Sequence, residues 1–401
     1  MIQLLLVIIY LSFISLGLPD SLLGSAWPSM YNTLNVPVSY AGIISMIIAM
    51  GTIISSLQSD RFTRKLGTGK ITLLSVGMTA IALLGFSTSH SFWLLCLWAI
   101  PFGLGAGSVD AALNNYVALH YKSRHMSWLH CMWGVGASLG PYVMGYALLD
   151  GQNWNMGYLY ISMLQIGLTF ILLVSQPLWK HKAIMVSKIN THVSEKSLTL
   201  KQVISLPGAK EIMITFFGYC ALEQTVGLWG TSYLVLHNGL TPESAAQFAA
   251  LFFLGITLGR AVSGFLTLVV NNVNMVRLGQ LFIFVGLLIL ILPFANDFTK
   301  VGFVLIGLGC APIYPSIIHS TPEIFGTENS QAVIGIEMAS AYVGTCIMPP
   351  LFGVLAQNIS INIFPAYIFL ILIVMIFMHE KSILKSKQQP KLRGFMEDKY
   401  D

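Results

Sequence analysis

Charged residues are scarce in this sequence, and the shortage limits the classes of protein to which it can belong. Only 9% of the 401 residues are Asp, Glu, Lys or Arg, whereas 55% are apolar. A soluble chain of this length would carry far more charge, so the composition indicates a protein that lies mostly in a lipid bilayer. The net charge of +5 gives no reason to expect a nucleic-acid partner, and we expect none.

Cysteine pairs, metal-ligand clusters and enzyme signatures are missing as well. The sequence has no CxxC pair and no His/Cys cluster at metal spacing. It also lacks a Walker A loop, an HExxH motif, a GxSxG elbow and a dinucleotide fingerprint. We therefore expect a protein that is not an enzyme and that binds no cofactor and no metal. We interpret the five cysteines as small apolar packing residues: Cys96, Cys131, Cys220, Cys310 and Cys346.

Long apolar runs are abundant. A membrane-spanning helix needs about 20 apolar residues. The first run has no charged leader and no small-residue cleavage site, so we interpret it as an uncleaved span. Twelve runs follow one another, at 3–31, 38–59, 70–88, 91–119, 126–149, 156–178, 208–236, 243–268, 274–294, 299–320, 329–355 and 361–379. We predict an all-α membrane protein with twelve transmembrane helices: a six-helix bundle over 1–179, a cytoplasmic linker over 180–207, a second six-helix bundle over 208–380 and a cytoplasmic tail over 381–401.

The distribution of basic residues predicts how these spans are oriented. Cytoplasmic loops of membrane proteins collect Lys and Arg. If the N-terminus lies inside, all but two of the 21 basic residues fall in the even-numbered connections and the C-terminal tail. The exceptions are Lys300 on the other side and Arg260 within a span. We therefore expect a multi-pass plasma-membrane protein with both termini in the cytoplasm, and the compact loops favour a bacterial inner membrane.

The two halves of the sequence share a pattern of residues at a nearly constant offset. Matches of this kind, in order, indicate a duplicated six-helix unit, and many transporters are built from such internal repeats. The matched residues are Asp20 and Gly24 with Glu223 and Gly227, Gly51 with Gly255, Gly103 and Gly105 with Gly307 and Gly309, and Gly136 and Pro141 with Gly344 and Pro349.

Three acidic residues fall about halfway along predicted spans, namely Asp20, Asp110 and Glu223. A carboxylate in the bilayer costs roughly 2.5 to 3.5 kcal/mol and by default marks an ion or substrate pathway. Three buried acids at one depth cannot comfortably all ionise, so at least one should bind a proton near neutral pH. Asn114 lies one helical turn after Asp110. The alternative is a buried Asp110 that is held only by hydrogen bonds within its helix.

Two motifs resemble signatures of the major facilitator superfamily. The stretch from Ser56 to Lys65 is similar to the loop between the second and third helices, although Ser56 and Thr63 replace the usual glycines. The stretch from Gly136 to Gly145 resembles the glycine/proline motif of the fifth helix. The resemblance implies two bundles that rock about a central site lined by the first, fourth, seventh and tenth spans.

Within that superfamily, the sequence is most similar to the fucose/galactose/glucose proton symporters. The stretch from Leu18 to Leu23 resembles their acidic motif in span one, and Gly103 to Asn115 resembles their motif in span four, where family members commonly have Glu instead of Asp110. The resemblance implies that Asp20 and Asp110 serve a proton and a sugar. The expected partners are therefore a small sugar, a proton and the lipid bilayer, and we expect a monomer.

A sugar presents hydroxyl groups and flat apolar ring faces, so polar groups beside aromatic rings are its expected ligands. Trp27 and Tyr233 lie near span ends and are interpreted equally well as interfacial anchors. Among the aromatic residues, Trp229 is the stronger candidate because it follows Glu223 by six residues. The residues that we expect to bind substrate are Asn114, Asn115, Trp133, Gln224, Trp229 and Tyr314.

Charged residues near the cytoplasmic ends of spans are candidates for a gate. We expect a cytoplasmic latch between helices, formed by Asp60 with Arg61, Arg64 and Lys65, and a plain excess of positive charge is the alternative. Arg260 and Glu337 are costly if unpaired inside the membrane. We expect them to pair with each other or with two further acids, Glu323 and Glu328.

Three functions remain open. The motifs around Asp20 and Asp110 favour proton-coupled uptake of a monosaccharide or related polyol. The motif from Gly136 to Gly145 is also typical of exporters, so proton antiport of drugs or metabolites is the alternative. A membrane receptor or scaffold that transports nothing is disfavoured, because so few charges are present and several lie inside spans.

Overall fold

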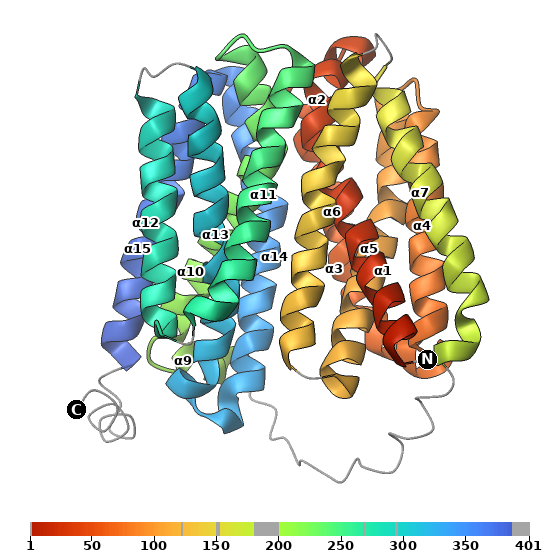
Figure 1. The fold of residues 1–401 in the computed structure, drawn as a ribbon. Coiled ribbons are helices and arrows are strands. Elements are labelled where there is room, and N and C mark those ends of the chain that lie inside the picture. The colour runs from red at the N-terminus through yellow and green to blue at the C-terminus, as the bar shows by residue number, and fades with distance from the viewer. Residues whose placement is uncertain are drawn as a thin grey trace.

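The computed structural model describes residues 2–121, 123–149, 153–179, 200–267, 269–292 and 296–386. This part of the chain is helical, without strands, and forms two side-by-side groups of helices (Figure 1). The first group contains α1 (Ile2–Asp20), α2 (Leu22–Leu34), α3 (Tyr40–Leu66), α4 (Thr68–Ser87), α5 (Phe92–His120), α6 (Ser123–Leu149) and α7 (Trp154–Val174). The second contains α9 (Leu200–Ser205), α10 (Ala209–Leu236), α11 (Pro242–Leu266), α12 (Asn272–Ile291), α13 (Asn296–Phe325), α14 (Thr327–Asn358), the 3-10 helix η1 (Ile361–Ile363) and α15 (Phe364–Ser386).

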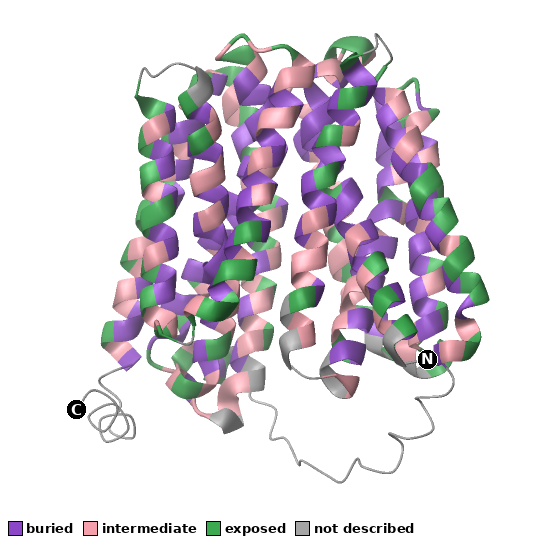
Figure 2. Ribbon diagram, viewed as in Figure 1, coloured by how far each residue is buried: buried purple, intermediate pink, exposed green. Residues whose placement is uncertain are grey.

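The helices are long enough to cross a bilayer. In the described part of the chain, ten are both long and apolar enough to do so, when α1 and α2 are taken together. The two remaining long helices, α6 and α10, have 27 and 28 residues and pack among the others. Many large apolar side chains point outward, where lipid would cover them, and Figure 2 shows exposed residues along the outer helices. The predicted all-α membrane fold with twelve crossings is therefore confirmed.

Some boundaries differ from the apolar runs. The first crossing is broken at Ser21, because α1 ends at Asp20 just after Pro19 and α2 begins at Leu22. The helix α9 lies inside the segment that we predicted as a linker, and α15 continues to Ser386 rather than to 380. Residues 180–199 and 387–401 lie outside the described residues.

Glycines place the helices of each half in the same way. A side chain on Gly103 of α5 would collide with the Ile48 carbonyl of α3, and one on Gly51 of α3 would press on Gly103. In the other half, Gly307 of α13 faces the backbone of α11, whose Gly255 faces Gly307 in return. Small residues allow such close approach of helices in membranes. The contact between equivalent glycines at an offset of 204 supports the predicted duplication.

A second pair of contacts repeats in the same manner. Gly136 of α6 packs against the backbone of α1 at Ile14, and Gly344 of α14 packs against the backbone of α10 at Phe217. Gly136 and Gly344 are matched in the sequence at an offset of 208, and Ile14 and Phe217 are separated by 203, the offset between Asp20 and Glu223. Each half therefore uses the glycine of its fifth crossing to dock onto its first crossing.

The two bundles meet mainly toward one end of the molecule. Gly24 of α2 lies against Gly227 of α10, and Gly42 of α3 lies against Pro350 of α14. The outer part of α6 also contacts the start of α11, at Gly145. In Figure 1 these segments lie at the upper end, whereas the start of α1 and the end of α15 lie at the lower end. The interface is therefore closed at the end opposite the start of α1 and the end of α15.

Candidate functional site

Asp20 occupies the break in the first crossing. It is the last residue of α1, and the chain turns at Ser21 before α2 begins. The indole Nε1 of Trp133 on α6 donates a hydrogen bond of 2.8 Å to the Asp20 carboxyl oxygen Oδ2. Although protein surrounds this carboxyl group, the residue keeps an exposed surface. Discontinuous helices commonly form the central sites of transporters.

Asp110 lies on α5 beside a polar partner. Asn114, one turn later, donates from Nδ2 to Asp110 Oδ1 at 2.9 Å, as the spacing predicts. The other end of that amide, Asn114 Oδ1, is buried and has no hydrogen-bond partner among the described residues. Tyr314 of α13 and Tyr342 of α14 interact electrostatically with Asp110. Asp110 therefore faces the other bundle, with a buried acceptor beside it that has no described partner.

Glu223 has a more elaborate environment on α10. The residue is 8% exposed, and the hydroxyl of Tyr219, one turn earlier, donates to its Oε2. Arg260 of α11 interacts electrostatically with both Tyr219 and Glu223. The guanidinium carbon of Arg260 also lies 4.9 Å from the centre of the Trp133 ring, in a cation–π contact across the bundle interface. Arg260 is therefore the described cation that acts on Glu223, and it does so beside Tyr219 rather than through a direct salt bridge between the described side chains.

The three acids are close enough to affect one another. Asp20 interacts electrostatically with both Asp110 and Glu223. Within the described part of the chain, neither Asp20 nor Asp110 forms a salt bridge with a Lys or Arg side chain. The site thus contains three carboxyl groups and one guanidinium group, which serves Glu223. Asp20 and Asp110 are left with only neutral hydrogen-bond donors.

The predicted pairing of Arg260 with Glu337 is not what the structure has. Arg260 lies at Glu223 and Trp133, whereas Glu337 is completely buried and contacts the hydroxyl of Thr321. Of the proposed alternative acids, Glu323 is exposed, and the side chain of Glu328 lies outside the described residues. The rotation of α11 directs Arg260 toward α6 and α10 rather than toward α14.

The other predicted gate residues lie at the cytoplasmic end of α3. Arg61 is exposed, while the side chains of Asp60 and Arg64 lie outside the described residues, so the proposed latch stays a prediction. Higher on the same helix, the hydroxyl of Ser56 interacts with Tyr342 of α14 and donates to the Gly107 carbonyl oxygen at 3.1 Å. The first residue of the family-like loop motif thus connects α3 to α5 and to the other bundle.

The predicted substrate ligands fall into two groups. Asn115 and Gln224 are exposed, and Tyr314 and Trp133 are half-buried near the acids. Trp229, in contrast, is 0% exposed, and its indole Nε1 donates to the Pro349 carbonyl oxygen at 2.8 Å inside the C-terminal bundle. In this conformation Trp229 packs the bundle and is not accessible to a ligand.

Sequence reasoning missed two contributors to this site. Tyr219 lies one turn before Glu223, and that i, i+4 spacing was the available signal. Thr257 of α11 approaches Ser138 of α6 at 3.3 Å between hydroxyl oxygens, directly across the bundle interface, where Gly134 makes room. No pattern in either helix identifies that second pair before the bundles are docked.

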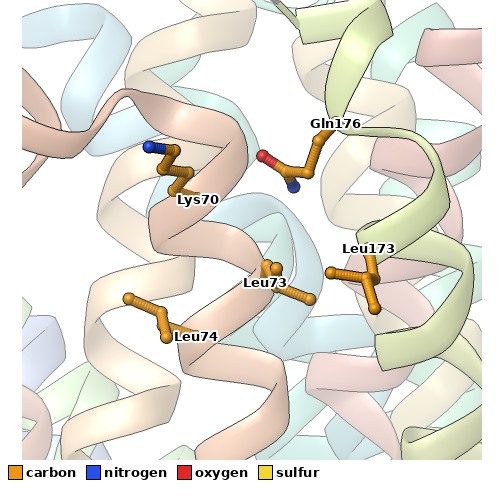
Figure 3. Close-up of a pocket in the computed structure, with 5 residues that line it drawn as sticks. All are labelled: Lys70, Leu73, Leu74, Leu173 and Gln176. Atoms are coloured by element: carbon orange, nitrogen blue, oxygen red, sulfur yellow. The ribbon is translucent and has the colours of Figure 1, made fainter.

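A separate hollow lies on the outer surface of the first bundle. A cavity of about 300 Å³ between α4 and α7 is lined by apolar side chains with Lys70 and Gln176 at its rim (Figure 3). It contains none of the acids, and its apolar lining suits lipid better than a polar solute. Among the described residues, no group of three or more His, Cys, Asp or Glu side chains could hold a metal ion.

Two bundles with duplicated helix packing around buried acids define a membrane transporter fold. The family model of the Major Facilitator Superfamily matches residues 9–299 and 231–395 of this chain. The chain therefore belongs to the Major Facilitator Superfamily.

Known proteins give the same fold. A solved structure of a mutant of the nucleoside transporter NupG superposes with a TM-score of 0.75, at 12% identity, over 94% of this chain and 98% of that one. A bacterial homolog of the human lysosomal transporter Spinster, inward-facing and unoccupied, gives a TM-score of 0.72 at 11% identity over 96% and 97%. In sequence, the chain is 22% identical over 387 residues to the Saccharomyces cerevisiae "Bypass of stop codon protein 6", a match that covers 88% of this chain and 77% of the relative.

Proposed function

We propose that this protein couples the entry of protons to the uptake of a monosaccharide or related polyol by alternating access. The observation that supports this proposal is a difference between the three central acids in their contact with a cation. Arg260 acts electrostatically on Glu223, whereas Asp20 and Asp110 interact with no described cation. Two uncompensated carboxyl groups at short range favour a shared proton, because like charge and low dielectric both oppose double ionisation.

Polar atoms around Asp110 suit the hydroxyl groups of a sugar. Asn114 Oδ1 is a buried acceptor with no described partner, and a buried polar group without a hydrogen bond is costly. Asn115 and Gln224 are exposed and offer amide donors and acceptors. The half-buried ring of Trp133 supplies an aromatic face next to Asp20. An excess of carboxyl groups over cations disfavours anionic solutes such as sugar phosphates.

The bundle interface supports the alternating step of this proposal. The close contacts Gly24 with Gly227 and Gly42 with Pro350 seal the end opposite the termini. We place both termini in the cytoplasm of a bacterial cell, on the basis of the Lys and Arg distribution, so this conformation would be the inward-facing one. Protonation of Asp20 or Asp110 removes a charge from the interface, and the bundles can then rock while the monomer carries the loaded site across.

The driving force is sufficient for concentrative uptake. One proton that enters down a potential of 100 mV contributes about 2.3 kcal/mol. At one proton per sugar, this free energy supports a gradient of roughly fifty-fold, since 1.4 kcal/mol corresponds to a factor of ten. Exchange of labelled sugar across the membrane does not need this energy. A variant that keeps exchange but loses concentrative uptake has therefore lost proton coupling and not sugar binding.

Uptake into proteoliposomes with an imposed pH gradient tests the proposal. A panel of labelled fucose, galactose and glucose is offered to the wild type and to Asp20→Asn, Asp110→Asn and Glu323→Gln, the last as an exposed-carboxylate control. We expect both Asp variants to lose uphill uptake, at least one of them to keep exchange, and the control to match the wild type. Normal concentrative uptake by both Asp variants would show the mechanism to be wrong.

Proton-coupled export of drugs or metabolites is the second candidate function. It is favoured by the exporter-like stretch from Gly136 to Gly145. Gly136 packs tightly on α1, and small residues of this kind allow such a close helix contact. In the same vesicles, drug efflux toward the side with the higher drug concentration, together with absent sugar uptake, would favour export.

A further inference from the structure

A fourth buried acid lies outside the central cluster. Glu337 of α14 is 0% exposed. Its two carboxyl oxygens lie 3.0 and 3.1 Å from the hydroxyl oxygen of Thr321, a buried residue of α13. Among the described residues, Thr321 supplies the hydrogen bonds of this carboxyl group. The protonation state of Glu337 therefore depends on whether the single hydroxyl hydrogen of Thr321 points toward the carboxyl group or elsewhere.

The hydroxyl of Thr321 has a second acceptor within reach. Its oxygen also lies 3.0 Å from the carbonyl oxygen of Ile317, one turn earlier in α13. A threonine hydroxyl donates one hydrogen bond and accepts two. If its hydrogen points to Ile317, the hydroxyl can only accept from Glu337, which must then carry a proton. If Glu337 were ionised, the Thr321 hydrogen would be its one donor, and its other lone pairs would be buried without partners.

Nearby charges do not change this balance. The helices packed against α14 carry titratable side chains, but none of those described acts electrostatically on Glu337. Glu223 accepts a hydrogen bond from Tyr219 and interacts electrostatically with Arg260. A buried carboxylate without a cation is unfavourable, because the low dielectric gives no substitute for water. The described charged and histidine side chains on these helices are Arg61 and Lys65 on α3, Lys201 on α9, Lys210, Glu211 and Glu223 on α10, Lys300, His319 and Glu323 on α13, and His379, Glu380, Lys381 and Lys385 on α15.

We propose that Glu337 and Thr321 form a second proton-binding site, which holds a proton between α13 and α14 independently of Asp20 and Asp110. Glu337 donates to Thr321, and Thr321 donates to Ile317, so one bound proton completes a chain of hydrogen bonds that joins the two helices. Loss of this proton would leave a bare carboxylate in a dry site. The proton is therefore released only when α13 and α14 separate and water reaches Glu337.

Infrared spectroscopy on the purified full-length protein in detergent tests this site without any solute. A protonated carboxyl group has a C=O stretching band that is separate from the bands of carboxylates. We expect the wild type to show at neutral pH a component of this band that Glu337→Gln removes, whereas any component from Asp20 or Asp110 persists in that variant. Glu323→Gln is the matched control, because Glu323 is an exposed acid near the end of α13 and contributes no such band. Thr321→Val should keep the band and shift its frequency, because the acid loses its acceptor.

Two results would overturn the proposal. The first is a Glu337→Gln spectrum identical to that of the wild type in the protonated-carboxyl region, from a variant with the wild-type Tm and gel-filtration profile. If Glu337→Gln does not fold, Thr321→Val decides alone, and an unshifted band then rejects the hydrogen bond from Glu337. Neither result depends on the proposed sugar uptake, so failure of this site and failure of the transport proposal are distinguishable.

Discussion

Removal of Arg260 should reveal which acid it neutralises. Arg260→Ala leaves Glu223 as a charge at 8% exposure, and loss of one partner of a buried pair costs about 3 to 5 kcal/mol. The variant also loses the cation–π contact with Trp133, which contributes about 0.5 to 2 kcal/mol. Adding Glu223→Gln removes the stranded charge. We therefore expect the double variant to be more stable than Arg260→Ala alone, although it has one more substitution.

Equilibrium unfolding in mixed detergent micelles measures the four corners of this double-mutant cycle. Residues in one hydrogen-bond network, as Tyr219 links Arg260 and Glu223, give coupling energies of about 0.5 to 3 kcal/mol, whereas independent sites add within about 0.5 kcal/mol. The matched cycle of Arg260→Ala with Glu337→Gln should be additive, because Glu337 contacts Thr321 instead. The assignment of Arg260 to Glu223 is refuted if Glu337→Gln restores the stability of Arg260→Ala and Glu223→Gln does not. The proposed difference between Glu223 and the other two central acids would then be wrong as well.

Three further predictions concern packing and the central hydrogen bond. Trp133→Phe keeps the ring but removes the donor to Asp20, a bond to a charged group that contributes about 1.5 to 3 kcal/mol, so proton-driven uptake should fall at least about tenfold. Gly103→Ala should lower the free energy of unfolding by about 1 to 3 kcal/mol because it crowds α3, whereas Gly167→Ala, in open space, should not. Gly24→Leu should slow sugar exchange, since it wedges α2 from α10; unchanged exchange would contradict that closure.

Much of the fold could be predicted from the sequence because bilayer thickness sets the length of each apolar run. The number of crossings, the duplication and the small-residue faces at Gly51 and Gly103 follow from that constraint and from spacing within single helices. Asn114 was found for the same reason, since i, i+4 neighbours share a helix face whatever surrounds them. Such predictions need no knowledge of how helices dock.

Contacts between helices were less accessible to prediction. Arg260 could reach an acid on α10 or on α14, and only the rotation of α11 decides between Glu223 and Glu337. Trp229 has the same ambiguity, because the polar residues of α10 are spread around the helix and define no single polar face from which to judge the direction of an aromatic side chain. The break at Ser21 was also missed, because the apolar run from α1 to α2 is continuous in composition.

The duplicated halves carry an acid at the same place, but they have diverged in how they treat it. Asp20 and Glu223 stand at matching positions, and among the described residues a guanidinium group acts on Glu223 but none acts on Asp20. Under the proposed mechanism, the Glu223 half supplies a fixed charge pattern and the Asp20 half supplies the group that binds and releases a proton. Swapping the two residues would therefore not exchange their roles, since the asymmetry resides in the surrounding helices and not in the acids.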